Sequence, residues 1–259
     1  MESLSASVAL VTGGGRGIGR AISMRLASMG AAVAVNYRRD EEAAQATVEA
    51  IGEKGGTARA YRASVDDDDA LRAMVDAVAD DLGPVDVLVN NAGLAGRGLH
   101  VADGAVAELD RLFAVHARAP FELSRLVLPG MRARGGGSIV MISSRASDLF
   151  LPGAGPYSMV KVAMDALAYT LAKEERRHGI RVNVVAPGLV DTEMGRRLVK
   201  TAVGGDIHDL ADSCDAGEIC RPEDVAEVVA FLVSPAARHV WGERVKVDSG
   251  DPIVRGAVS

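Results

Sequence analysis

Short apolar runs alternate with longer segments of helical spacing along the whole 259-residue chain, and this alternation constrains the fold more than any other feature. The apolar runs are rich in Val, Ile and Leu. Strands of that composition are buried on both faces, which requires a parallel sheet with helices on each side. The pattern therefore predicts the α/β class and a doubly wound Rossmann fold, with a seven-stranded parallel sheet in a single domain over residues 1–259.

The expected elements follow one another in a regular order. Strands are expected at Val8–Thr12, Ala32–Tyr37, Thr57–Ala63, Val85–Asn90, Ser138–Ser143, Ile180–Ala186 and Arg244–Val247. Helices are expected at Ile18–Met29, Glu41–Glu53, Asp67–Leu82, Val106–Arg134, Tyr157–Arg177 and Pro222–Val233. From Asp191 to Cys220 the alternation stops, and Gly195, Gly204, Gly205 and Gly217 are spread through the segment. Long insertions in compact domains are commonly functional loops, so we expect a substrate lid over residues 191–220.

The charge balance argues against a nucleic-acid partner. The chain has 29 basic and 35 acidic residues and a net charge of −6, whereas non-specific nucleic-acid binding depends on an excess of Lys and Arg. The two cysteines, Cys214 and Cys220, have neither metal-ligand nor redox spacing, and no metal site is expected. The chain starts without a basic leader and has no apolar stretch long enough for a membrane span. We therefore expect a cytoplasmic protein with no nucleic-acid or membrane partner.

A glycine-rich turn follows the first predicted strand and leads into the first predicted helix. It reads Thr12-Gly13-Gly14-Gly15-Arg16-Gly17-Ile18-Gly19. Glycines let the backbone approach a pyrophosphate, and a helix start offers unpaired N–H groups to it. The spacing Gly13-x-x-x-Gly17-x-Gly19 differs from the general dinucleotide fingerprint, and a tight turn without a ligand is the alternative. We predict that Gly13, Arg16, Gly17, Ile18 and Gly19 contact a dinucleotide.

The charges near the second predicted strand favour NADP(H) over NAD(H). An NAD-selecting site places Asp or Glu at the end of this strand, to hold the ribose 2′-hydroxyl. Here the strand runs into Arg38 and Arg39, and Arg16 lies in the glycine turn. Guanidinium groups offer planar, bidentate donors to a 2′-phosphate. Asp40 follows the arginines, and we expect it to cap the next helix instead of holding a ribose.

Tyr157 and Lys161 are four residues apart in a segment of helical spacing, so both side chains project from one helix face. A phenol of ordinary pKa is a poor base near neutral pH, and we expect the neighbouring ammonium to lower its pKa. Each residue has a structural alternative, with Tyr157 as a surface residue and Lys161 as a solvated charge. Taken together, the pair predicts proton transfer.

Four motifs in order carry a resemblance to a known family. They are the glycine turn, Asn90-Asn91-Ala92-Gly93, Tyr157-x-x-x-Lys161 and Pro187-Gly188-x-x-x-Thr192. With these motifs the chain resembles the short-chain dehydrogenase/reductase family, including its 3-oxoacyl-acyl carrier protein reductases. The resemblance covers essentially the whole chain and ends at Val247-Asp248-Ser249-Gly250, where relatives usually have Val-Asp-Gly-Gly.

The resemblance implies an oxidoreductase that moves a hydride between the nicotinamide and a carbonyl or secondary alcohol. It implies that Tyr157 donates or accepts the proton, that Lys161 also holds the nicotinamide ribose, and that Ser144 hydrogen-bonds the reacting oxygen. Ser143 is the alternative serine, one residue out of register. Further cofactor contacts are implied at Ser64, Val65, Asn91, Ala92, Gly93, Pro187, Gly188, Val190 and Thr192. At Ser64, relatives have an Asp that touches the adenine, so that contact is less firmly implied.

His116 is a departure from the family, whose members usually carry a catalytic Asn at this position. That Asn helps to hold a water connected to the lysine, largely through its main chain, so His116 could preserve the water. Alternatively, the imidazole could join the proton relay, because its ordinary pKa of about 6.5 lies in the working range. The hypothesis predicts that activity survives with an altered pH profile.

The expected substrate is a small-molecule carbonyl or alcohol, such as a ketone or a 3-oxoacyl thioester, and an acyl carrier protein is a further candidate partner. By resemblance, the predicted helices Val106–Arg134 and Tyr157–Arg177 would form the interfaces of a homotetramer. The alternative function is a catalytically weakened NADP(H)-binding sensor or assembly protein, for which His116 and Ser64 are the only support.

Overall fold

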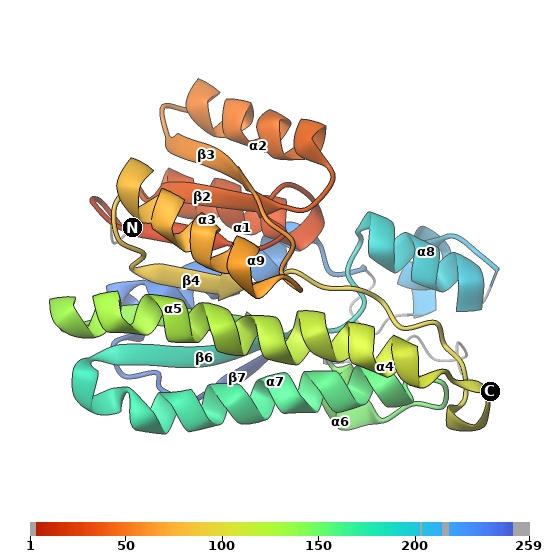
Figure 1. Cartoon of the computed structure of the whole chain (residues 1–259). Helices are drawn as coiled ribbons and strands as arrows, with labels where there is room; N and C mark the ends of the chain where they lie inside the picture. Colours follow the sequence, from red (N-terminus) through yellow and green to blue (C-terminus); the bar gives the residue numbers. More distant parts are fainter. Residues whose placement is uncertain (1–3, 203, 214–217, 251–259) are drawn as a thin grey trace.

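The structure is a computed structural model, and it describes residues 4–202, 204–213 and 218–250. Seven parallel strands form one sheet in the order β3-β2-β1-β4-β5-β6-β7. The strands are β1 (Val8–Val11), β2 (Ala32–Tyr37), β3 (Thr57–Arg62), β4 (Val87–Asn90), β5 (Gly137–Ile142), β6 (Ile180–Pro187) and β7 (Arg244–Val247). The predicted doubly wound, seven-stranded parallel sheet is confirmed (Figure 1).

Helices cover both faces of the sheet (Figure 1). They are α1 (Gly17–Ser28), α2 (Glu41–Glu53), α3 (Asp68–Asp81), α4 (Val106–Phe113), α5 (Ala119–Arg134), α6 (Ala146–Leu149), α7 (Gly155–Glu174), α8 (Glu193–Ala202) and α9 (Pro222–Val233). The apolar side chains of α3, α5 and α7 share one core with the sheet, and those of α1, α2 and α9 share the other.

The composition of β1 explains why it lies in the middle of the sheet. Successive side chains of a strand point to opposite faces. Val8 and Leu10 belong to one core, whereas Ala9 and Val11 belong to the other. All four residues are buried, so a helix is needed on each face.

The strand order creates a crevice at the carboxyl ends of the strands. β1 lies between β2 and β4. After β2 the chain passes over one face of the sheet, and after β4 it passes over the other face. Ligands of open parallel sheets bind at such a switch point. The glycine turn follows β1, the Asn91–Gly93 loop follows β4 and Ser144 follows β5, so the fold gathers the predicted site residues at one edge.

The predicted helix Val106–Arg134 is interrupted in the structure. α4 and α5 are joined by a π-helical turn, Ala114–Arg118, in which Ala119 N bonds to Ala114 O. Pro120 has no N–H and cannot donate to His116 O, so a regular α-helical ladder cannot pass this point. The interruption therefore places a widened turn at His116.

Other elements differ in smaller ways from expectation. α7 begins at Gly155, two residues before the predicted start, because Pro156 suits the first turn of a helix. The predicted lid contains α8 and a 3₁₀ segment, Ile207–Ser213, and Val190 pairs with Cys220 at its base. Cys220 is a buried free thiol, whereas Cys214 and Gly217 lie outside the described residues. Among the described residues, no helix is long and apolar enough to cross a membrane.

Candidate active site

The glycine turn between β1 and α1 forms a cradle of backbone atoms. Gly13 and Gly17 have φ angles of +61° and +51°, in the left-handed region that favours glycine. A Cβ on Gly19 would lie 2.1 Å from Gly13 O, so the turn closes tightly on the helix. The Arg16 side chain makes no capping hydrogen bond at the start of α1. A helix start of this kind can bind an anion through its N–H groups, and the cradle therefore fits a dinucleotide phosphate.

The loop after β4 is fastened to this cradle. Thr12 Oγ1 accepts hydrogen bonds from Asn91 N and Ala92 N, each at 2.9 Å. Asn91 Nδ2 donates to Thr12 O at 2.8 Å. Gly13 N donates to Asn36 Oδ1 at 3.2 Å, which joins β2 to the same turn. The structure thus brings together the two loops that the resemblance assigned to the cofactor.

The charged groups near the end of β2 follow the expected arrangement. Asp40 caps α2 by accepting a hydrogen bond from Ala43 N at 3.1 Å, and its predicted capping role is confirmed. Arg16 Nη1 donates to Glu193 Oε2 at 3.4 Å and lies 3.9 Å from Asp40 Oδ2. Arg38 is exposed directly after the strand. The Arg16 and Arg38 side chains are thus both exposed, in the glycine turn and just after the end of β2.

The segment after β3 is stabilised by a local hydrogen bond. Ser64 Oγ bonds to Asp66, and this bond, with the positive charge of Arg38 nearby, holds the pKa of Asp66 below its usual range. Val65 is buried in the core and Ile18 packs partly buried against the other core. The side chains of Val65 and Ile18 therefore stabilise the edge of the sheet where the cofactor is predicted to bind. Contact of Ile18, Ser64 and Val65 with a cofactor stays a prediction.

The segment after β6 closes the crevice on its other side. Gly188 N donates to Val247 O at 3.0 Å, and Pro187 O accepts a hydrogen bond from Arg145 N at 2.9 Å. Thr192 Oγ1 accepts from Gly195 N at 3.0 Å. A Cβ on Gly17 would lie 3.3 Å from Thr192 Cγ2, so the two predicted cofactor-binding segments lie close together. Val190, which is buried, lies within this segment.

Tyr157 and Lys161 lie one turn apart on α7, and Lys161 is 3% exposed. Lys161 Nζ donates to Ile142 O at 2.8 Å and lies 5.7 Å from the centroid of the Tyr157 ring. Burial lowers the pKa of Lys161 to about 7, although the negative charge of Asp165 opposes this shift. The ammonium therefore loses its proton near neutral pH.

The expectation that Lys161 lowers the pKa of Tyr157 is wrong. Burial raises the pKa of Tyr157 to about 12, and only its hydrogen bond with Ser144 opposes that shift. The ammonium is bonded to Ile142 O and lies near the ring. Tyr157 is consequently a neutral phenol at neutral pH, the form that donates a proton.

Ser144 is the serine beside Tyr157. Its hydroxyl shares a hydrogen bond with the phenol, and its Oγ accepts a hydrogen bond from Ala146 N at 3.1 Å. Ser143 Oγ is buried and has no hydrogen-bond partner among the described residues. The geometry thus supports Ser144 over the alternative one residue earlier.

His116 lies against Tyr157 in the π-helical turn. The two rings meet edge to face, with centroids 5.4 Å apart and planes at 88°. Leu94 N donates to His116 Nε2 at 3.1 Å, and Leu94 O is 2.9 Å from the same atom. Burial and the charge of Lys161 lower the pKa of His116 to about 3. The imidazole is therefore neutral throughout the working range, and the premise of a titrating relay is not met.

Sequence reasoning missed two residues beside this site. Asp165 lies one turn beyond Lys161 on α7, and Arg244 reaches it from β7. The spacing of Asp165 from Lys161 was visible in the sequence, but the approach of Arg244 depends on the sheet order. Within the described part of the chain, no group of three or more His, Cys, Asp or Glu side chains is placed to hold a metal ion.

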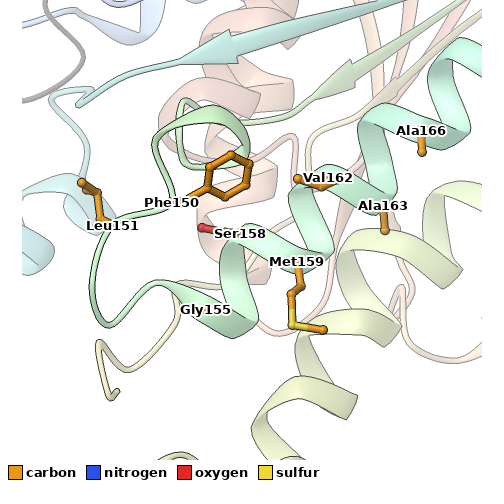
Figure 2. Close-up of a pocket in the computed structure, with 8 residues that line it drawn as sticks. All are labelled: Phe150, Leu151, Gly155, Ser158, Met159, Val162, Ala163 and Ala166. Carbon is orange, nitrogen blue, oxygen red and sulfur yellow. The ribbon is translucent and has the colours of Figure 1, made fainter. Parts of the chain in front are cut away.

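An apolar hollow lies along α7 (Figure 2), and its lining includes none of Ser144, Tyr157 and Lys161. Its volume is about 570 Å³, and Phe150, Leu151, Met159 and Val162 are among its lining residues. Helical residues advance by about 100° each, so Met159 and Val162 point away from the Tyr157 face. The hollow is therefore separate from the candidate catalytic groups.

Residues 7–202 match the family model described as short chain dehydrogenase. The chain is 37% identical over 256 residues to versicolorin reductase stcU of Emericella nidulans, covering 95% of this chain and 96% of that one. It is 34% identical over 243 residues to the 3-oxoacyl-[acyl-carrier-protein] reductase FabG of Staphylococcus epidermidis, covering 93% and 97%.

Solved structures agree with this relationship. A 7α-hydroxysteroid dehydrogenase complexed with NADH and 7-oxo glycochenodeoxycholic acid matches with a TM-score of 0.89 and 32% identity, covering 98% of this chain and 97% of that one. A gluconate 5-dehydrogenase from Burkholderia cenocepacia, in complex with NADP and tartrate, matches with a TM-score of 0.87 and 32% identity, covering 96% of both chains. The predicted resemblance is confirmed.

Proposed function

The chain belongs to the short-chain dehydrogenase/reductase family of oxidoreductases, which act on carbonyl and alcohol groups, and from this we propose that it is an NADP(H)-dependent ketone or 3-oxoacyl reductase. The observation that carries the proposal is the arrangement of Ser144, Tyr157 and Lys161 beside the glycine cradle. A hydroxyl, a neutral phenol and a buried ammonium converge at the edge of the sheet where ligands of this fold bind.

The protonation states favour reduction. A phenol with a pKa of about 12 holds its proton at neutral pH and can give it to a developing alkoxide. Ser144 Oγ donates a hydrogen bond to the same oxygen, which stabilises its negative charge. Lys161, when protonated, stabilises the phenolate that remains until a solvent proton replaces the one transferred. A bound nicotinamide supplies the hydride for the carbonyl carbon.

We propose that His116 has a structural role and connects two parts of the site. Its ring contacts Tyr157 and bonds to the backbone of Leu94, so it joins the loop after β4 to α7. A pKa of about 3 keeps the imidazole neutral near pH 7, so we assign it no role as a general acid. We therefore expect the neutral imidazole to position the phenol and to leave proton transfer to Tyr157.

The choice of NADP(H) is supported by the side chains around the cradle. Asn36 is buried, bonded to Gly13 and carries no carboxylate, and Asp40 is engaged as the cap of α2 through Ala43 N. Arg16 and Arg38 are both exposed. Their guanidinium groups would hold a 2′-phosphate by charge and by paired hydrogen bonds. Arg16 would exchange its exposed contact with Glu193 for the phosphate.

We expect the exposed apolar side chains of α8 and α7 to form the substrate lid and the subunit interface. In α8, Met194 and Leu198 are 45% and 53% exposed, and we expect them to cover the substrate. Met159 and Val162 form part of the outer hollow on α7, and we expect a second copy to cover it in a homotetramer. An acyl carrier protein is a candidate carrier of the substrate.

The direct test is NADPH oxidation with a panel of carbonyl compounds that contains acetoacetyl thioesters, diketones, quinones and keto sugars. We expect turnover with at least one class, and a loss of about 10²-fold to 10⁴-fold in kcat for Tyr157→Phe with NADPH affinity retained. Tight NADPH binding without turnover on any carbonyl would instead support the cofactor-binding sensor. Faster turnover with NADH than with NADPH would contradict the cofactor assignment.

A further inference from the structure

Lys161 carries its charge in an environment that offers it little stabilisation. Its side chain is buried, and within the described residues Ile142 O is its one hydrogen-bond acceptor. Burying a charged ammonium is costly unless an opposite charge or several acceptors compensate it. If the reaction needs Lys161 as a cation, a nearby negative charge is therefore required to favour its charged form.

Asp165 is placed to supply that potential. It lies one turn after Lys161 on the same face of α7, and its side chain is 10% exposed. Asp165 Oδ1 is buried without a hydrogen-bond partner in the described part of the chain. A buried carboxylate oxygen left unpaired is unfavourable for stability alone, which points to an electrostatic role for this side chain.

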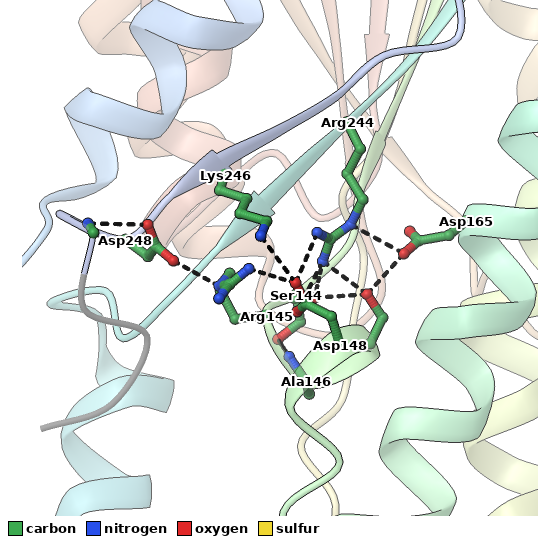
Figure 3. A network of polar contacts seen from close by, with 10 residues as sticks. Ser144, Arg145, Ala146, Asp148, Asp165, Arg244, Lys246 and Asp248 are labelled. Carbon is green, nitrogen blue, oxygen red and sulfur yellow. Dashed lines mark hydrogen bonds and ion pairs between the residues drawn. The ribbon is translucent and has the colours of Figure 1, made fainter. Parts of the chain in front are cut away.

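The other oxygen of Asp165 is held by two donors (Figure 3). Ser147 Oγ donates to Asp165 Oδ2 at 2.7 Å, and Arg244 Nε donates to the same atom at 3.2 Å. Arg244 Nη2 also donates to Ser144 O at 2.9 Å. Arg244 thus fixes both the carboxylate behind Lys161 and the backbone of the residue whose hydroxyl meets Tyr157.

The ionisable groups that face Lys161 come from two elements. Tyr157 and Asp165 lie on its own helix, and His116 faces it from the π-helical turn. Tyr157 and His116 are neutral near pH 7 because their pKa values are about 12 and about 3. Asp165 is therefore the one carboxylate side chain among these groups, and Arg244 Nε bonds to it at 3.2 Å.

We propose that Asp165, held in place by Arg244 and Ser147, is a positioning residue whose negative charge favours the ammonium form of Lys161 in the catalytic site. The inference rests on the proposed reductase function, because a charged Lys161 matters there for stabilising the Tyr157 phenolate. Asp165 itself does not touch the reacting atoms. Its effect reaches them through the protonation of Lys161.

The test compares the wild-type chain with Asp165→Asn, which keeps the shape of the side chain and removes its charge. The chain has five lysines, so the ¹⁵Nζ signal of Lys161 can be assigned by its loss in Lys161→Met and then titrated by NMR. We expect the pKa of Lys161 to fall by about one pH unit or more in Asp165→Asn. This measurement requires no turnover, so it stays informative even if the proposed reaction is wrong.

The kinetic arm uses the pH dependence of NADPH-dependent reduction. In Asp165→Asn we expect the high-pH limb of kcat/KM to move to lower pH by a similar amount, with the low-pH plateau retained. Structural damage would instead lower kcat/KM at every pH, including the low-pH plateau. The matched control is Asp148→Asn, because Asp148 also accepts from Arg244, at 3.2 Å, yet is not among the groups that face Lys161.

The double variant Asp165→Asn/Arg244→Met removes the ion pair as a unit and guards against misfolding caused by an unpaired arginine. The same fall in the pKa of Lys161 is expected there. An unchanged pKa of Lys161 in both variants, or an equal fall in Asp148→Asn, would overturn the proposal. If neither the wild type nor Tyr157→Phe shows turnover, the proposed function is contradicted. The inference about Lys161 is then tested by the NMR titration alone.

Discussion

Replacing Lys161 by Met should stabilise the protein in a pH-dependent way. Burial lowers the pKa of Lys161 from the ordinary value of 10.5 to about 7. Between these two values the unfolded chain binds more protons at this position than the folded chain, so the free energy of unfolding of the wild type rises with pH. Below pH 7 both states are charged, and the full cost of the buried ammonium is present.

The size of the effect follows from the two pKa values. A difference of one pKa unit corresponds to about 1.4 kcal/mol, so the buried charge costs on the order of 5 kcal/mol below pH 7. At pH 9 about 2 kcal/mol of that cost remains, because most of the Lys161 side chains in the folded protein are then neutral. Met has a similar length and no charge, so the stability gained by Lys161→Met should shrink by about 3 kcal/mol between pH 6 and pH 9.

The assay is reversible urea unfolding of the wild type and of Lys161→Met at pH 6, 7.5 and 9. The control is Lys246→Met, since the Lys246 side chain is 52% exposed, whereas Lys161 is buried. We expect a difference between wild type and variant that changes with pH for Lys161 and stays constant for Lys246. Parallel pH dependences for the wild type and Lys161→Met would refute the reasoning, because the buried ammonium would then carry no abnormal proton affinity.

Three further substitutions test other parts of the site. His116→Asn should leave the midpoint of the pH–rate curve unchanged, because the pKa of His116 is about 3; a shifted midpoint in steady-state kinetics would show that the imidazole titrates during turnover. Gly93→Ala should cost about 1–3 kcal/mol in urea unfolding, since its Cβ would lie 2.9 Å from His116 Cε1, and the cost should diminish in a His116→Ala background. Equal costs in both backgrounds would rule out that contact as the cause. Arg38→Asp should raise KM for NADPH about tenfold or more and leave KM for NADH nearly unchanged, and equal changes for both cofactors would contradict a 2′-phosphate contact.

Much of the candidate site was predictable from local patterns. Gly13 and Gly17 adopt positive φ angles, which favour glycine, so the turn could be predicted from the glycines in the sequence. Tyr157 and Lys161 share a helix face because their spacing is a property of the helix alone. The strand at β1 was predictable because burial on both faces requires an unbroken apolar run.

Other features were beyond local patterns. The π-helical turn at His116 interrupts an apparently continuous helix, and its cause, the missing N–H of Pro120, is visible in the sequence only once the helix register is known. The contact of Arg244 with Asp165 joins residues 79 positions apart. It exists because β7 and α7 both pack against β6, which no spacing along the chain expresses.

The parallel sheet, the order of its motifs and the residues at its carboxyl edge could be predicted from the chain alone, because periodicity and glycine conformation are local properties. The ionisation of those residues could not. Desolvation and long-range charge contacts lower the pKa values of Lys161 and His116 and raise that of Tyr157. These effects depend on what surrounds a side chain in space, so the proton chemistry of the site belongs to the packed molecule.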